Sequence, residues 1–389
     1  MQIFIMDTML PPEGNGWTTH KWEFVRSLSK SDYEVHVMTH RGTELGGVTT
    51  HPIKFKEEYK LGFNFKFMHL LNILKNVRQC HPDILYTRNV SFALLAFFTI
   101  QKPKLILELN GLYEEHRKFE KKIYGKKKVL KNLKLIMKDR LEIFVAGKAN
   151  GVIAVTPKIK DLLIKRGIDE NKITVVPNGA NVELFRPMDD PLAINDLRYQ
   201  CNIREDAPLV MFVGNLAYWQ GVEYLIHSSP LVLKTISNTM FLIVGDGEVK
   251  DELMALAEKI GVSDKFIFVG NVPYKKVPLY INMADVCIVT KKILGFGYSP
   301  LKLYEYMACG KPIVATNTEG FEVLEQSNAG LLVNPENSQE LANAIIKLLR
   351  NDQLREQMGA NGRKAAVAGY SWDNSAKKTI SVFKKVING

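Results

Sequence analysis

The residues best placed to do chemistry fall in one stretch, GFGYSPLKLYEYMACGKPIVAT at 295–316. Its glycine-rich turn leads into Ser299 and Pro300, and a proline at this point predicts the first turn of a helix. The unpaired N–H groups at such a helix start can bind an anion. Lys302 follows in the same turn, where acidic residues are usual, so we expect a diphosphate to supply the negative charge. Glu305, about one turn on, is suited to bind a pair of hydroxyls such as those of a ribose.

The alternative for this stretch is an ordinary amphipathic helix with two surface charges, which the misplaced lysine and the neighbouring glycines disfavour. Glycine-bearing loops also follow three predicted strands, and glycine lets backbone N–H groups approach a ligand closely. Each loop is weak support by itself, because glycines in turns are often only structural. The candidate ligand contacts in these loops are Gly14, Asn15, Gly16, Gly214 and Asp246.

Two series of short β-rich runs, separated by helical patterns, must position these residues. Strands that alternate with helices imply right-handed crossovers and parallel sheets covered on both faces. The first series is 3–6, 34–38, 83–86, 104–109, 151–155 and 173–176; the second is 209–213, 240–244, 265–269, 285–289 and 312–316. We therefore predict an α/β chain of two Rossmann-like domains that face each other across a cleft, with ligands bound beyond the carboxyl ends of the strands.

The 389 residues suggest two or three structural units. Between the two series lies VPNGANVELFRPMDD at 176–190, where proline, asparagine and glycine cluster and the hydrophobic period is lost, as is typical of a hinge. We predict one Rossmann-like domain at 1–178 and a second at 179–370. A last helix at 371–389 is expected to pack back toward the first domain.

The composition is that of an ordinary globular protein, with 46% hydrophobic and 24% charged residues. The net charge of +11 points to an anionic partner: nucleic acid, an acidic lipid surface or phosphorylated substrates. Between Arg117 and Arg140 eleven basic residues face two acids, with aromatic and aliphatic residues interleaved. This segment, 117–140, is either a solvated helix face or a helix that lies on an anionic membrane. We expect no nucleic-acid partner, because no helix-turn-helix, zinc or RNA-binding signature accompanies the charge.

The four cysteines are far apart and show no spacing typical of a zinc site, a redox motif or a disulfide framework. We interpret them as reduced thiols in a reducing compartment. The first residues show no basic leader, and the longest later apolar run, 90–100, is shorter than the roughly 20 residues of a membrane span. These features predict a cytoplasmic protein, and the 117–140 segment would place it on the inner face of a membrane.

The motifs resemble those of the GT-B glycosyltransferases of family 4, and the resemblance covers essentially the whole chain. It is carried by PNG at 177–179, FVGN at 212–215, VGDG at 244–247, GNVPY at 270–274 and SPLKLYEYMACGKPIVAT at 299–316. The resemblance implies a retaining transfer from a nucleotide-sugar in the cleft between two Rossmann-like domains, without a metal ion or other cofactor. It also implies that 1–178 is the acceptor-side domain and 179–370 the nucleotide-sugar donor domain. The lack of an Asp-x-Asp motif agrees with a metal-free reaction.

By this resemblance Glu305 matches the second glutamate of the family's pair, which binds the ribose. The loop that would wrap the diphosphate and sugar comprises Tyr298, Ser299, Pro300 and Leu301. Val272 and Pro273 lie where backbone atoms of the family meet the base.

The chain departs from the family's pattern at several site positions. Gly297 stands where the first glutamate would be, and Asn215 and Gln220 replace a common basic pair. Lys302 is therefore our candidate for the charge that holds the diphosphate, and preorganised donors around the phosphates should supply most of the rate. Asn110 occupies the region where many relatives place a catalytic histidine, and His116 is close by. Either could assist the reaction, and His20 and Arg88 are further candidate contacts.

Three functions follow from these observations. The first is a transferase that passes a sugar to a glycan, lipid-linked or other acceptor in cell-envelope or glycoconjugate synthesis. The second is a nucleotide-sugar epimerase, which would need no separate acceptor. The third is a non-catalytic partner subunit, suggested by the lost glutamate and basic pair. A nicotinamide dehydrogenase is disfavoured, because no GxGxxG follows the first strand.

Overall fold

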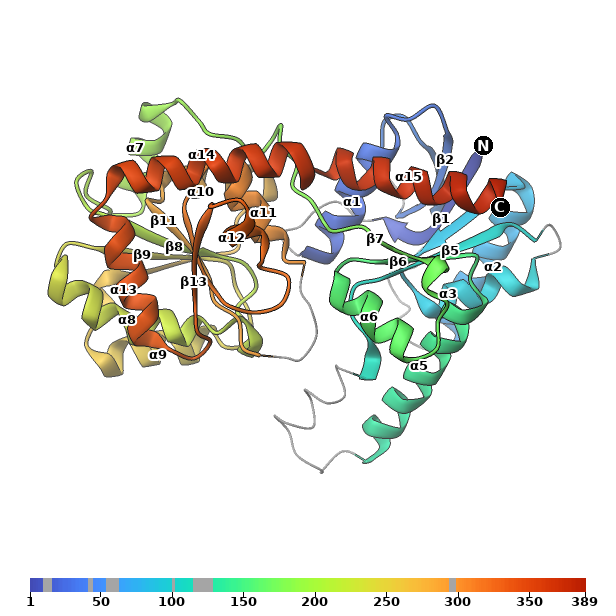
Figure 1. The fold of residues 1–389 in the computed structure, drawn as a ribbon, viewed down its shortest axis with the longest axis horizontal. Helices are drawn as coiled ribbons and strands as arrows, with labels where there is room; N and C mark the ends of the chain where they lie inside the picture. The colour runs from blue at the N-terminus through green and yellow to red at the C-terminus, as the bar shows by residue number, and fades with distance from the viewer. Residues whose placement is uncertain (10–15, 41–44, 54–62, 100–101, 115–128, 294–298) are drawn as a thin grey trace.

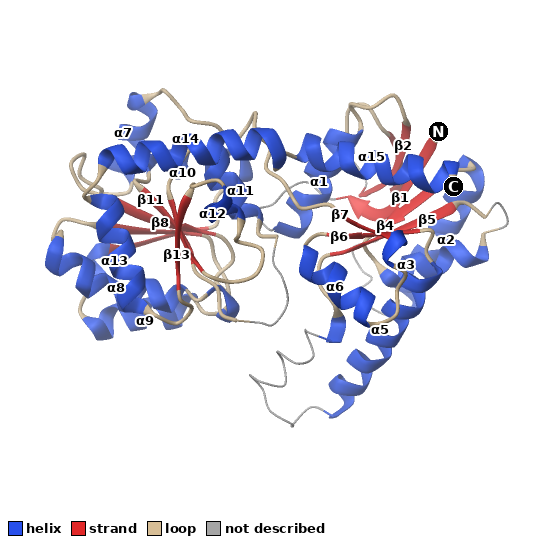
Figure 2. Cartoon of the chain, viewed as in Figure 1, coloured by secondary structure: helices blue, strands red, loops and turns tan. Residues whose placement is uncertain are grey.

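The computed structural model describes residues 1–9, 16–40, 45–53, 63–99, 102–114, 129–293 and 299–389 (Figure 1). They form two parallel sheets, each with helices on both faces (Figure 2). The predicted architecture of two Rossmann-like domains is confirmed. We call the parts built on the two sheets the amino-terminal and the carboxy-terminal domain.

The amino-terminal domain has a seven-stranded sheet in the order β3-β2-β1-β4-β5-β6-β7. Its strands are β1 (Gln2–Met9), β2 (Glu34–His40), β3 (Thr49–Ile53), β4 (Ile84–Thr87), β5 (Lys104–Leu109), β6 (Gly151–Ala154) and β7 (Ile173–Val175). Its described α-helices are α1 (Gly16–Leu28), α2 (Phe63–Cys80), α3 (Val90–Ala93), α5 (Val129–Lys148) and α6 (Pro157–Lys165), with 3-10 turns at η1 (Leu94–Phe98) and η2 (Glu170–Lys172). Apolar clusters fill both faces of this sheet.

The carboxy-terminal domain has a six-stranded sheet in the order β10-β9-β8-β11-β12-β13. Its strands are β8 (Leu209–Val213), β9 (Met240–Val244), β10 (Phe266–Gly270), β11 (Val286–Val289), β12 (Ile313–Thr316) and β13 (Gly330–Val333). The helices of this half are α7 (Pro191–Gln200), α8 (Val222–Thr235), α9 (Lys250–Ile260), α10 (Val277–Met283), α11 (Leu301–Ala308), α12 (Val323–Gln326), α13 (Ser338–Leu349) and α14 (Asp352–Gly369), with 3-10 turns at η3 (Tyr218–Gln220), η4 (Ser263–Lys265) and η5 (Tyr274–Lys276). All five residues of β8 are buried, as expected for a central parallel strand that is covered on both faces.

The last helix, α15 (Trp372–Asn388), leaves the carboxy-terminal domain and packs on the amino-terminal one (Figure 1). Trp372 and Phe383 are buried in one apolar cluster with Ile3 of β1. The chain therefore passes between the domains twice, at 176–190 and at 370–372, and the predicted boundaries after 178 and 370 lie at these passages.

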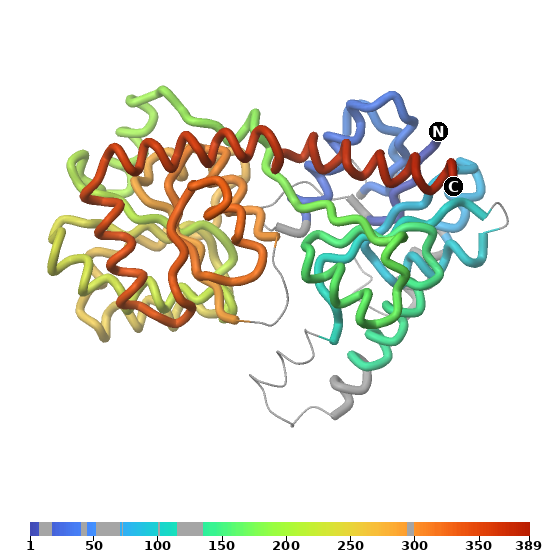
Figure 3. The backbone as a smooth tube through the Cα atoms, in the orientation of Figure 1, coloured from blue at the N-terminus to red at the C-terminus, as the bar shows by residue number. Residues whose placement is uncertain are grey.

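The two passages run side by side (Figure 3) and are joined by hydrogen bonds. The Ala180 N–H donates to the Tyr370 carbonyl at 2.8 Å, and the Trp372 N–H donates to the Ala180 carbonyl at 3.1 Å. The Ser375 hydroxyl donates to the Pro177 carbonyl at 2.8 Å. The connection between the domains therefore consists of two chain segments, whereas the sequence predicted one hinge, at 176–190.

Gly179 is required where the two passages touch. A Cβ on this residue would lie 2.4 Å from the Ser371 carbonyl carbon, so Gly179→Ala must push the passages apart. We expect a loss of about 1–3 kcal/mol in the free energy of unfolding, measured by urea denaturation. Gly369→Ala, next to the same passage but with open space at its Cβ, is the control and should be neutral or slightly stabilising. Equal stability of the two variants would contradict the proposed contact.

Candidate functional site

A cavity of about 210 Å³ lies where the two domains meet. Its lining comprises Thr19, Val213, Gly214, Asn215, Gln220, Tyr274, Val277, Lys291, Pro300, Leu301, Lys302 and Glu305. Thr19 comes from α1 of the amino-terminal domain, and the others come from loops and helix starts of the carboxy-terminal domain. We call this space the interdomain cavity. It brings together most of the residues that the sequence selected in the carboxy-terminal half.

Lys302 and Lys291 are the two lysines among the described residues that line the cavity. Lys302 Nζ donates to Gln220 Oε1 at 3.1 Å and lies 3.7 Å from the centroid of the Phe212 ring. Burial lowers the pKa of Lys302 well below its ordinary value, and the charge of Lys291 lowers it further. Burial also lowers the pKa of Lys291, to about 7. Two buried amines on one cavity wall are costly by themselves, and a bound anion would offset that cost.

Gly214 leaves the room that Lys302 occupies. It follows β8 with φ +139°, and a Cβ there would lie 2.6 Å from Lys302 Nζ. The start of α11 is held from the hinge, because the Asn178 backbone N–H donates to Ser299 Oγ at 3.0 Å and its Nδ2 to the Ser299 carbonyl at 2.7 Å. The predicted anion site is thus fastened directly to the passage between domains.

Glu305 is buried and has a raised pKa, unlike an ordinary surface glutamate. Burial raises its pKa to about 8, and Glu23 of α1 raises it further, while Lys302 opposes the shift. Near neutral pH a carboxyl with this pKa is mostly protonated, so it can both donate to and accept from a hydroxyl. Glu23 is itself buried, and its Oε1 accepts from Asn181 Nδ2 at 3.2 Å.

These pKa shifts predict that a nucleotide-sugar binds more weakly as the pH rises. A diphosphate favours the protonated, ammonium forms of Lys302 and Lys291. At low pH these amines are already protonated, whereas at high pH they must take up protons when the ligand binds, which weakens binding. Ionisation of Glu305 above about pH 8 adds a repelling charge. We expect the dissociation constant to rise by roughly tenfold per proton per pH unit between about pH 7 and 9, measured by isothermal titration calorimetry. An affinity that is constant or improves over this range would contradict the assignment.

A second cavity, of about 260 Å³, lies entirely in the amino-terminal domain. It is lined by Arg88, Val90, Glu108, Leu109, Asn110, Gly111, Tyr113 and Glu142. We call it the β5 cavity, because Glu108 and Leu109 end strand β5. Its polar wall is a network of buried side chains rather than a set of independent groups.

Glu108 is the centre of that network. It accepts from the Tyr86 hydroxyl and from Asn110 Nδ2, the latter at 3.1 Å, and Arg88 Nε lies 3.1 Å from its Oε1. Burial alone would raise its pKa, but the interactions of Glu108 with His20, Arg88 and the Tyr86 hydroxyl outweigh burial and lower the pKa to about 2. Glu108 is therefore an anion at any physiological pH.

His20 links α1 to this network in one tautomer. Its Nδ1 lies 2.5 Å from Arg88 Nη1, and a guanidinium can only donate, so Nδ1 accepts. The ring proton is then on Nε2, which lies 3.2 Å from Glu108 Oε1. Burial and the nearby Arg88 lower the His20 pKa, which agrees with a neutral ring. Because Thr19 lines the interdomain cavity, His20 stands between the two cavities.

Glu142, on the same wall of the β5 cavity, shows the reverse shift. Burial raises its pKa to about 8, its oxygen accepts from the Tyr113 N–H at 3.0 Å, and Asp139 adds repulsion. Two buried glutamates thus line one cavity at neutral pH, with Glu108 ionised and Glu142 mostly protonated.

The remaining predicted residues are divided among several places. Asn110 lies in the β5 cavity and not beside Lys302. Val272 and Pro273 line a third cavity, of about 860 Å³, together with Trp22, Glu23 and Arg26 of α1. Asp246 bonds within its own loop, to the Gly247 N–H at 2.8 Å. Gly16 begins α1. Gly14, Asn15, His116, Gly297 and Tyr298 lie outside the described residues.

Four residues of the cavity walls were not predicted from the sequence: Glu23, Glu108, Glu142 and Lys291. Lys291 lies two residues after β11 and Glu108 lies at the end of β5, so the rule that ligands gather at the carboxyl ends of parallel strands could have found both. Glu23 and Glu142 occupy helix interiors, where nothing in the local pattern separates a buried glutamate from an exposed one.

Two family models match the chain. The model described as Glycosyltransferase Family 4 matches residues 14–184, and the model described as Glycosyl transferases group 1 matches residues 194–365. The two matches follow each other along the chain and fall on the amino-terminal and the carboxy-terminal domain.

Relatives carry similar descriptions. One uncharacterized glycosyltransferase of Methanocaldococcus jannaschii is 25% identical, over 100% of this chain and 99% of that protein. A second from the same organism is 31% identical, over 60% of this chain and 59% of that protein. A GDP-mannose-dependent alpha-(1-6)-phosphatidylinositol monomannoside mannosyltransferase of Mycobacterium tuberculosis is 29% identical, over 52% and 53%. The matched part thus spans little more than half the length of the last two relatives.

Solved structures share the fold over the full chain. Sucrose-phosphate synthase from Thermosynechococcus elongatus superposes with a TM-score of 0.78 at 18% identity, covering 100% of this chain and 99% of that one. HepE of Anabaena in complex with UDP-glucose gives a TM-score of 0.75 at 19% identity, covering 99% and 100%. At these identities the likeness establishes the architecture alone. Among the described residues, no helix has the length and apolarity required to cross a membrane.

Proposed function

Because the chain belongs to the GT-B glycosyltransferases of family 4, we propose that it moves a sugar from a nucleotide-sugar to an acceptor with retention of the anomeric configuration. The observation that carries this proposal is the interdomain cavity. It combines two buried lysines, whose charge an anion would offset, with a protonatable glutamate suited to hydroxyls and with Thr19 from the opposite domain. In this proposal the donor fills that cavity and the acceptor approaches from the amino-terminal domain.

The amine groups of Lys302 and Lys291 supply the charge that a departing nucleotide diphosphate needs. Both are preorganised and buried, which is where electrostatic stabilisation of developing charge is strongest. We therefore propose a reaction that needs no metal ion or cofactor. The amides at the start of α11 add donors without any cost of reorganisation.

The acceptor site is proposed to be the β5 cavity. Its carboxylate, amide and guanidinium groups form the kind of polar wall that binds sugar or inositol hydroxyls. In His20, Nδ1 already accepts from Arg88 and Nε2 carries the ring proton toward Glu108, so neither nitrogen can take a proton from the acceptor hydroxyl. We therefore assign that role to a carboxylate. Asn110 holds Glu108 in place and acts through it.

The acceptor is further proposed to be a glycan or lipid-linked molecule near an anionic membrane, as in cell-envelope synthesis. Phe98 of η1 is 70% exposed and Met137 of α5 is 66% exposed, and basic residues Lys138 and Arg140 lie exposed beside the latter. Exposed apolar groups among basic ones fit an anionic lipid surface. One relative is named for a phosphatidylinositol-based acceptor. We expect flotation with phosphatidylglycerol vesicles and none with phosphatidylcholine vesicles; equal behaviour would refute this location.

A panel of UDP-, GDP-, ADP- and dTDP-sugars, scanned by thermal shift, tests the donor site. A ligand at about 100 times its dissociation constant should add roughly 2.7 kcal/mol of stability. We expect one nucleotide class to stabilise the protein and Glu305→Ala to abolish the shift. If the whole panel leaves the melting temperature unchanged, the partner-subunit alternative takes precedence.

The reaction products distinguish a transferase from the alternative, a nucleotide-sugar epimerase. With the stabilising donor and a mixture of candidate acceptors, a transferase releases the nucleoside diphosphate in proportion to acceptor. An epimerase converts the donor without releasing the nucleotide, and its rate is independent of any acceptor.

A further inference from the structure

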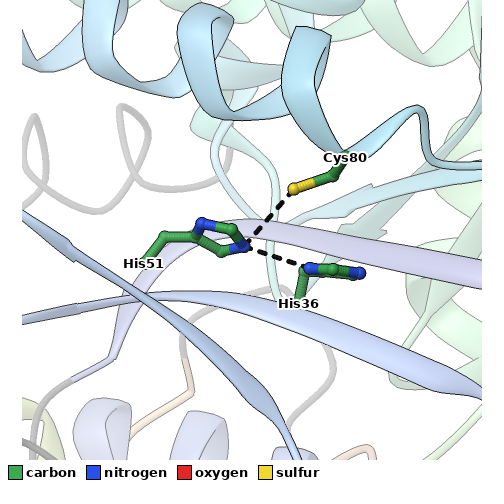
Figure 4. A group of neighbouring side chains, drawn as sticks. All are labelled: His36, His51 and Cys80. Carbon is green, nitrogen blue, oxygen red and sulfur yellow. Dashed lines mark hydrogen bonds between the residues drawn. The ribbon is translucent and has the colours of Figure 1, made fainter.

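Two histidines and a cysteine converge on the amino-terminal sheet, outside both polar cavities (Figure 4). His36 Nδ1 lies 3.0 Å from His51 Nε2, and Cys80 Sγ lies 3.4 Å from the same nitrogen. One ligating atom from each residue falls within 4.8 Å of the others. Histidine nitrogens and cysteine sulfurs are among the ligands that transition metals bind most readily.

The strand register explains why residues so far apart in the chain meet. In the parallel pair β2 and β3, His36 is opposite Thr49 and Met38 is opposite His51. His36 and His51 therefore project from the same face of the sheet. Helix α2 covers this face and ends at Cys80, whose thiol completes the group. Because the three residues come from two strands and a helix, no spacing motif marks them.

Two of the three separations between the ligand atoms are close to those around a tetrahedral ion, and the third is within 4.8 Å. Zinc binds nitrogen at about 2.0–2.1 Å and sulfur at about 2.3 Å, which separates tetrahedral ligand atoms by roughly 3.3–3.6 Å. The observed separations of 3.0 and 3.4 Å differ from these by a few tenths of an ångström. Shifts of that size are within the reach of side-chain rotation.

A neighbouring carboxylate orients the buried ligand. Glu34 Oε1 lies 3.1 Å from His36 Nε2, and Gln2 Nε2 donates to Glu34 Oε2 at 2.8 Å. The first distance is within ion-pair range, although Nε2 makes no hydrogen bond of regular geometry. A proton on His36 Nε2, the nitrogen that faces the carboxylate, would leave the Nδ1 lone pair free for a metal, the arrangement that metal-binding histidines commonly use. The ring of Phe4 packs 5.5 Å from that of His51 and 6.3 Å from that of His36, which restricts both rings.

We propose that His36, His51 and Cys80 bind one Zn²⁺ ion, with water at the fourth position. The two nitrogens and one thiolate favour zinc over the oxygen-seeking magnesium and calcium ions. Binding converts the Cys80 thiol to a thiolate and releases its proton to solvent. His51 and Cys80 are half-buried, so an ion can enter from the surface.

The place of the site indicates a structural role. Cys80 ends α2 just before β4 begins, at the amino-terminal edge of the strands, whereas the interdomain cavity lies beyond carboxyl ends. The ion would fasten the edge strand β3 and helix α2 to β2. It is separate from the sugar transfer, for which we propose no metal.

The test is metal binding by the full chain after treatment with a chelator. We expect isothermal titration with ZnCl₂ to give one ion per chain, and CoCl₂ to give a thiolate-to-cobalt charge-transfer band in the near ultraviolet. Cys80→Ser and His51→Gln should each weaken zinc at least tenfold and Cys80→Ser should abolish the band. Cys201→Ser alters another half-buried free thiol, in the carboxy-terminal domain, and should bind like the wild type.

Wild-type protein that takes up no stoichiometric zinc would overturn the proposal, as would Cys80→Ser protein with unchanged affinity and an intact band. A melting curve without metal identifies any variant that fails to fold, and His51→Gln and Cys80→Ser probe the site independently. The readout does not involve nucleotide-sugars, so it stands or falls separately from the proposed transferase activity.

Discussion

Lys302→Met is expected to reduce sugar transfer by about 10²–10³-fold while leaving the protein folded. Methionine keeps the length of the side chain and its packing against Phe212, but it removes the cation from the interdomain cavity. Because burial lowers the pKa of Lys302, a buried apolar group in its place should not reduce stability. The donor that gives the largest thermal shift is the substrate for the assay, and released nucleoside diphosphate is the readout.

Lys311→Met is the matched control. Lys311 is another lysine of the carboxy-terminal domain whose pKa is lowered by burial, but its Nζ donates to the Asn282 carbonyl at 2.8 Å and does not line the cavity. We expect it to alter stability and to leave turnover within about twofold. Wild-type turnover by Lys302→Met, or an equal loss in both variants, would remove Lys302 from the diphosphate site.

Glu108→Gln is expected to lower the free energy of unfolding by about 3 kcal/mol at pH 7. Its pKa falls from an ordinary 4.5 to about 2 in the folded protein, so ionised Glu108 stabilises the fold. Glutamine leaves Arg88 buried beside a neutral group, and breaking a buried ion pair in this way is costly. Urea denaturation at fixed pH gives the free energy directly.

The pH dependence of this loss has a definite sign. The stabilisation from Glu108 is fully present above about pH 4.5 and disappears as the pH falls through about 2, so the gap between variant and wild type should close in acid. Glu142→Gln is the control from the same cavity wall. Burial raises the pKa of Glu142 to about 8, so above pH 4.5 this carboxyl ionises in the unfolded chain but not in the folded one. The wild type loses stability over this range, and Glu142→Gln should therefore become more stable relative to the wild type as the pH rises from 4.5 toward 8. Two variants that behave alike would contradict the assigned network.

The sequence predicted every described strand of the two sheets except one edge strand in each. Neither β3 nor β13 was expected, and each lies at the edge of its sheet. β3 contains Pro52, which disrupts a strand pattern and is tolerated at an edge, and β13 has only four residues. Central strands are buried on both faces and so carry a stronger hydrophobic signal.

The part of the candidate site that the sequence predicted is the part formed by one loop and the start of one helix. Ser299, Pro300, Lys302 and Glu305 are close in the sequence, and the local pattern places them together. The β5 cavity depends on contacts between α1, β4 and β5, such as the link between His20 and Glu108, and these follow from tertiary packing alone. For the same reason no spacing of cysteines could reveal the group around Cys80.

The double passage between the domains decides how the molecule can move. Because two chain segments are bonded side by side, we expect the domains to rotate about the line through them, since sliding or twisting would disrupt the Ala180 and Trp372 hydrogen bonds. Asn178, in the first of these segments, bonds to Ser299, which directly precedes Pro300 and Leu301 of the cavity lining. We therefore expect such a rotation to change the width of the interdomain cavity, and with it the rates of substrate entry and product release.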